Sequence, residues 1–100
     1  MTSFLELPRL DYQGRDRGAL YVNVADIITI QTEYEGTTRL DIRDNGSEGM
    51  ASTCLTYMPV PALLEALHEL ATSPGVFTWS DDSKARYLGP AMTRFQAAHA

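Results

Sequence analysis

The chain has 100 residues and a formal net charge of −5, with 44% hydrophobic and 21% charged residues. This is the length of one small domain, and the composition is typical of a folded protein. The negative charge opposes nucleic-acid binding, which needs a basic footprint, and no run approaches the roughly 20 apolar residues of a membrane helix. We therefore expect neither nucleic acid nor a membrane as a partner.

Strands are expected in the first part of the chain. Residues 4–7 form a short apolar strand, which Pro8 should end or confine to a sheet edge. Residues 13–18 are polar, contain two glycines and predict a turn. Residues 20–24 alternate apolar with polar side chains, the pattern of a half-buried strand, and residues 23–26 should interrupt it because Asn and Asp favour turns.

Three further strands should follow. Residues 27–32 are strongly β-branched and predict a strand. Residues 37–43 alternate and predict its hairpin partner, with the tip at residues 35–36. After a loop at residues 44–49, residues 50–58 form the last long strand.

One amphipathic helix is expected at residues 61–71. Leucines recur at three- and four-residue spacing from Leu63 to Leu70, with Glu65 and Glu69 on the other side. Prolines are tolerated at the start of a helix, and residues 73–75 should stop it.

The remaining residues predict weaker elements. Residues 76–79 suit either a short strand or an anchored loop, and Ser80 is placed to cap a helix that starts with two acidic residues. Gly89-Pro90 should break that helix, so residues 90–98 are expected to form a separate short one.

These elements predict an α+β fold. An antiparallel β-meander of about five strands packs against one amphipathic helix, followed by a short helical C-terminal extension. We expect residues 1–75 to form the core and residues 76–100 to pack on that core or on a partner.

A family resemblance covers residues 21–70. Residues 22–30 read Val-Asn-Val-Ala-Asp-Ile-Ile-Thr-Ile, residues 38–42 read Thr-Arg-Leu-Asp-Ile, and residues 61–67 read Pro-Ala-Leu-Leu-Glu-Ala-Leu. This pattern resembles the small FlbD-like proteins of flagellar operons and their bacterial and phage relatives. The resemblance implies a meander-plus-helix fold without catalytic residues. The chain departs from it in the loop at residues 44–49 and in the extension after Ala71.

Several catalytic and metal motifs are approached but not completed. Residues 41–46 resemble the start of a calcium loop, but Arg43 replaces its third ligand and Ser52 replaces the essential Glu. Ser47 lacks the preceding glycine of a nucleophile elbow, because that position is Asn45. Cys54, the only cysteine, and two distant histidines do not make a zinc set. We expect no metal, no cofactor and no catalytic residue, hence no enzyme.

The aromatic and basic residues after the helix are the predicted partner-binding residues. They are Trp79, Arg86, Tyr87, Arg94 and Phe95, and aromatic and Arg side chains are the favoured anchors of protein interfaces. The alternative, preferred for Trp79, is that the rings cover the open side of the sheet.

Charge is distributed unevenly along the chain. Residues 83–100 carry Lys84, Arg86 and Arg94 and no acidic residue, whereas all thirteen acidic residues precede them. A basic tail on an acidic body indicates docking on the chain's own body or on an anionic partner.

The leading functional hypothesis is a non-catalytic protein-interaction module that self-associates or docks on a protein partner, such as a phage structural or accessory protein. With a single cysteine the expected location is cytoplasmic, or the virion for a phage structural protein. One alternative is an inhibitor that presents its acidic face to a basic host protein. Another is a ligand-binding protein or enzyme that uses His68, Asp41 or Glu33 in a pocket between subunits.

Overall fold

The computed structural model describes residues 2–11, 13–33, 37–43 and 51–99, with backbone alone at residues 51 and 94–99. The predicted hairpin tip at residues 35–36 and the loop at residues 44–49 lie outside these ranges. The elements are β1 (Phe4–Leu10), β2 (Asp16–Asn23), the 3-10 helix η1 (Val24–Asp26), β3 (Ile27–Thr32), β4 (Thr38–Arg43), β5 (Ala51–Thr56), α1 (Val60–Thr72), β6 (Val76–Phe77) and α2 (Asp81–His99).

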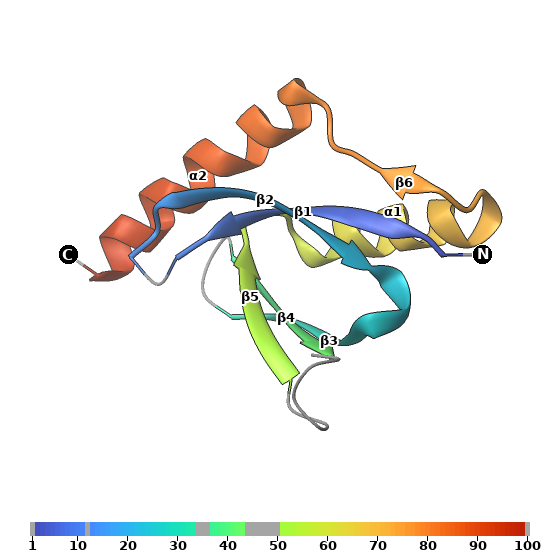
Figure 1. Ribbon diagram of the computed structural model, residues 1–100. Coiled ribbons are helices and arrows are strands. Elements are labelled where there is room, and N and C mark those ends of the chain that lie inside the picture. The colour runs from blue at the N-terminus through green and yellow to red at the C-terminus, as the bar shows by residue number, and fades with distance from the viewer. Residues whose placement is uncertain (1, 12, 34–36, 44–50, 100) are drawn as a thin grey trace.

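The fold is α+β, with one largely antiparallel sheet and two helices (Figure 1). The strands follow the order β2-β1-β5-β4-β3, and β6 pairs in parallel with β1. The predicted meander therefore holds for β3, β4 and β5, whereas β1 is inserted between β2 and β5. In Figure 1 the strands β3, β4 and β5 lie below the β1–β2 hairpin, and α2 lies above it.

β1 is longer than predicted, because Pro8 does not end it. The N–H of Val24 donates to the carbonyl of Ser3, so these two residues form a hydrogen-bonded pair of the β1–β2 ladder. Hydrogen-bonded and non-hydrogen-bonded pairs alternate in an antiparallel ladder, so the backbone N and C=O of residues 4, 6 and 8 point away from β2. On that side β6 pairs with the start of β1 and β5 with its end, so Pro8 lies between the two partners. Its missing N–H therefore removes no ladder hydrogen bond.

The middle of the chain folds largely as its pattern predicts. The bounds of β3 coincide with the prediction, and the Asn23 side chain accepts from the Ala25 N–H to start the predicted interruption, η1. β5 ends at Thr56, two residues early. There the Thr56 hydroxyl accepts from the Met58 N–H, and the Thr38 hydroxyl donates to the Met58 carbonyl.

The amphipathic helix α1 starts at Val60 and covers the predicted range. Leu63, Ala66 and Leu70 are buried in the core, but Leu64, which belongs to the same apolar pattern, is 53% exposed. The core combines this face of α1 with side chains of β1, β4 and the β5–α1 connection, chiefly Leu5, Leu7, Leu40 and Met58.

The predicted break at Gly89-Pro90 is wrong, because α2 runs for 19 residues through Pro90. Pro90 cannot donate to the Arg86 carbonyl, but its ring clashes little with the preceding residue because Gly89 has no Cβ. The following residue, Ala91, is 1% exposed and belongs to the core, which holds the helix in place. The predicted cap is confirmed, since the Ser80 hydroxyl accepts from the Ser83 N–H.

A buried carboxylate joins β1 to the start of α2. The Glu6 side chain, 6% exposed, accepts from the Trp79 backbone N–H at 2.8 Å and from Lys84 Nζ at 2.9 Å. The Trp79 indole N–H donates to the Glu6 carbonyl at 2.7 Å. That carbonyl faces the gap between β6 and β5, so the indole replaces a missing ladder partner. We call Glu6, Trp79 and Lys84 the Glu6 cluster.

The Glu6 cluster predicts a stability difference between substitutions. Glu6→Ala leaves the Trp79 N–H and Lys84 without their acceptor and should lower the free energy of unfolding by about 2–4 kcal/mol. Lys84→Met should cost less, about 1–2 kcal/mol, because the Glu6 carboxylate keeps the Trp79 N–H as a donor and Lys84 is 30% exposed. Urea unfolding followed by fluorescence of the only tryptophan measures both values. The exposed Glu65→Ala is the control, and equal losses for Glu6→Ala and Glu65→Ala would contradict the assignment.

Candidate functional site

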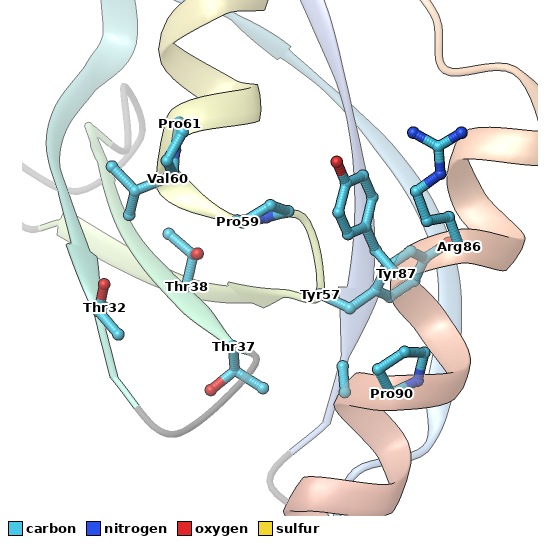
Figure 2. Close-up of a pocket in the computed structure, with 11 residues that line it drawn as sticks. Thr32, Thr37, Thr38, Tyr57, Pro59, Val60, Pro61, Arg86, Tyr87 and Pro90 are labelled. Carbon is cyan, nitrogen blue, oxygen red and sulfur yellow. The ribbon is translucent and has the colours of Figure 1, made fainter.

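A cavity of about 400 Å³ opens between the N-terminus of α1 and α2, over the ends of β3, β4 and β5 (Figure 2). We call it the α1–α2 groove. Its lining residues are Thr32, Thr37, Thr38, Tyr57, Pro59, Val60, Pro61, Arg86, Tyr87, Pro90 and Ala91.

The walls of the groove are apolar and stiff. Pro59, Val60 and Pro61 come from the chain that leaves β5 and enters α1, and Pro90 comes from α2. Proline has a fixed backbone angle and little side-chain freedom, so this wall loses little entropy when it is covered. Figure 2 shows the Tyr57 ring between Pro59 and Arg86.

Among the described residues that line the groove, Arg86 alone is charged. Its side chain is exposed, and within the described residues it makes no ion pair. Arg15, Arg17 and Arg39, in contrast, each lie within 4 Å of a carboxylate of the same chain. Arg86 is therefore a cation with no ion-pair partner in the described part of the chain, beside a largely apolar groove.

The structure places three of the five predicted partner-binding side chains around α2. Arg86 and Tyr87 line the groove. Trp79 is half-buried, with its ring edge-on to Phe77 at 4.7 Å, and it lines a second cavity of about 420 Å³ together with Tyr87. Arg94 and Phe95 lie further along α2, and only their backbone is described.

The other wall of the groove was not predicted. Tyr57, Pro59 and Val60 belong to a segment that the sequence identifies as a strand end and a helix start, and nothing in it marks a binding surface. The available signal was a tyrosine two residues before a Pro-Val-Pro run. Such a ring is held against rigid backbone at a point where the chain changes direction.

The acidic residues near the other end of the sheet serve the fold. The Asp41 carboxylate accepts from the hydroxyls of Thr29 and Thr53 and from Arg39, which joins β3, β4 and β5. The hydrogen bond from Thr29, supported by Arg39 and Thr53, holds the pKa of Asp41 below its ordinary value. Arg39 also faces Glu33 across the hairpin at 3.9 Å, as expected for cross-strand charge pairing.

Within one chain, the residues proposed for a pocket between subunits lie on different elements. His68 is exposed on α1, whereas Asp41 and Glu33 both pair with Arg39 on the sheet. Among the described residues, no three His, Cys, Asp or Glu side chains are grouped to hold a metal ion. Neither helix, over its described length, is long and apolar enough to cross a bilayer.

Comparison with known proteins identifies no relative. No family model matches the chain, and no curated protein or solved structure is significantly similar to it. The resemblance of residues 21–70 to the FlbD-like proteins stays a prediction.

The groove wall and the Glu6 cluster predict loss of stability at alkaline pH. Burial, followed by the charges of Asp16 and Glu6, raises the pKa of Tyr57, and the hydrogen bond to Glu6 raises the pKa of Lys84. In both cases folding favours the protonated form. The stability that these two protonated groups contribute is fully present below about pH 10. It is lost as the pH rises through their pKa values in the folded protein.

We expect the urea midpoint to fall above pH of about 10 and to fall less in the Tyr57→Phe, Lys84→Met double variant. The measurement is made in a Cys54→Ala background, because burial also raises the pKa of that thiol. Identical alkaline slopes with and without the double substitution would show that other groups control the transition.

Proposed function

We propose that the protein is a non-catalytic protein-interaction module that binds a segment of a partner protein in the α1–α2 groove. In this proposal the β-strands and α1 form the body, and α2 is the extension that faces the partner. The observation that carries the proposal is that Arg86, which makes no ion pair with any described residue, lies beside a groove walled by Tyr57, Tyr87 and prolines. Arginine and tyrosine are the residues on which binding energy concentrates in protein interfaces.

The chemistry of the groove limits what the partner segment carries. An apolar or aromatic side chain fits the space between Pro59, Val60 and Tyr57. A carboxylate beside it satisfies Arg86, whose planar guanidinium binds carboxylates with two parallel hydrogen bonds. We therefore infer a segment with an acidic residue next to an apolar one.

The alternative of an acidic inhibitor receives less support. Asp11, Glu33 and Asp41 lie within 4 Å of arginines of the same chain, and Glu6 is buried against Lys84. These four carboxylates are matched within the chain, so an acidic face for a basic target would depend on other exposed acids, such as Glu65, Glu69, Asp81 and Asp82.

A random peptide library displayed on phage tests the proposal directly. We expect wild-type protein to enrich peptides with an acidic residue beside an apolar or aromatic one. A synthetic peptide of the enriched sequence should bind about tenfold more weakly to Arg86→Gln and to Tyr87→Ala. Its affinity for the wild type should also fall with added salt, because Arg86 is exposed.

Arg43→Gln is the matched control, since Arg43 is an exposed arginine at the far end of β4. It should bind the peptide like the wild type. Equal binding by Arg86→Gln and wild type, or failure to enrich any peptide over an unrelated immobilised protein, would contradict the proposal.

A further inference from the structure

The strand β3 is an open edge of the sheet, since within the described residues it pairs with β4 alone. The opposite edge, β2, carries Asp16, Arg17 and a glycine, Gly18, at a φ of 77°. Charges and irregular backbone are the usual means by which edges avoid pairing with another chain. β3 contains no charge, proline or glycine from Ile27 to Thr32.

The free hydrogen-bonding groups of β3 follow from its ladder. The Glu33 N–H donates to the Thr37 carbonyl at 3.2 Å, so these two residues form a hydrogen-bonded pair. Antiparallel pairs alternate, which makes Gln31 the next residue bonded to β4. The N–H and C=O of Ile30 and Thr32 therefore point away from the sheet.

The register of β3 is irregular only at its start. Ile28 is the extra residue of a β-bulge between Ile27 and Thr29. The bulge leaves the Ile28 side chain 51% exposed. From Thr29 to Thr32 the strand pairs regularly with β4, so this stretch is a flat edge available for pairing.

An exposed leucine extends this edge onto the neighbouring helix. Val60, Leu64 and Leu67 follow one side of α1 at helical spacing. Val60 lines the α1–α2 groove with Thr32, and Leu67 lines another cavity with residues of η1, so this side of α1 runs along β3. Leu64, between them, is 53% exposed. We call Ile28, Ile30, Thr32 and Leu64 the β3 strip.

We propose that the β3 strip binds the same strip of a second copy of the chain. The two β3 strands would pair antiparallel about a two-fold axis at Gln31, with Ile30 opposite the partner's Thr32. This register uses the outward N–H and C=O groups of Ile30 and Thr32 and leaves the bulge outside the ladder. The axis is perpendicular to the sheet, so both α1 helices lie on one face and their Leu64 side chains meet.

Symmetry favours a second copy over a foreign strand, and charge does not oppose it at this edge. Each chain carries a net charge of −5, which repels another copy wherever charged surfaces meet. The β3 strip is uncharged, so pairing there brings no like charges of the strip into contact. A two-fold axis places the same strip of both copies in contact, so the free backbone groups of one β3 pair with those of the other and the two Leu64 side chains meet. This proposal shares Thr32 with the groove but does not require the function proposed there.

Sedimentation velocity and amide hydrogen exchange, each over a wide range of protein concentration, test the proposal. We expect a dimer that forms as the concentration rises. The amides of Ile30 and Thr32 should become protected together with the dimer, whereas that of Gln31, already bonded to β4, should be protected throughout. A protein that stays monomeric, with rapid exchange at Ile30 and Thr32, overturns the proposal, whether or not a foreign strand binds there.

Gln31→Lys places two like charges at the axis and should raise the dimer dissociation constant at least about tenfold. Thr32→Pro removes an outward N–H that the monomer does not use and should act in the same direction. Tyr21→Lys, on the other edge and 50% exposed, is the matched control and should dimerise like the wild type. Trp79 fluorescence confirms that each variant is folded. A dimer that Gln31→Lys leaves intact, or that Tyr21→Lys weakens equally, contradicts the proposed axis.

Discussion

The buried Glu6 carboxylate is the interaction on which the arrangement of the second half of the chain depends. Burying a carboxylate is unfavourable unless its oxygens are hydrogen-bonded and its charge is matched. The Trp79 N–H and Lys84 meet both requirements; Trp79 lies just before α2 and Lys84 lies in its first turn. α2 in turn supplies Arg86 and Tyr87 to the groove. The position of the proposed binding surface therefore follows from the hydrogen bonds and charge pairing of one acidic residue of β1.

Local patterning accounts for most elements of the fold, but this central contact lies beyond it. β3 and α1 follow from β-branched content and leucine spacing, because α1 buries one face and β3 half-buries Ile27 and Ile30. Glu6 alternates with Leu5 and Leu7, so the same rule places it on a solvent-exposed face. Its burial depends on Trp79, 73 residues away, which no local pattern predicts. The proposed binding surface also has a predictable and an unpredictable part. The aromatic and basic composition indicated its α2 side, whereas only tertiary packing adds Tyr57.

The two prolines that disagree with simple rules show why context decides. Pro8 continues a strand because it lies where β1 has no second partner, and Pro90 continues a helix because Gly89 precedes it and Ala91 is fixed in the core. At Pro8 the missing N–H removes no ladder hydrogen bond. At Pro90 it removes one helical hydrogen bond, and the packing of Ala91 supports the helix there. Proline excludes a hydrogen bond rather than an element. The distinction matters for function, because Pro90 places its ring in the groove wall.

The groove and the β3 strip meet at Thr32, which belongs to both. A dimer formed through β3 would carry its two α1 helices on one face and bring two grooves to that face. A partner with two acidic-apolar segments, or a repetitive assembly, would then bind both grooves at once. The second contact would be intramolecular, and affinity would rise without any new contact in either groove. A small module with one modest groove would in this way bind a polyvalent partner far more strongly than a single peptide.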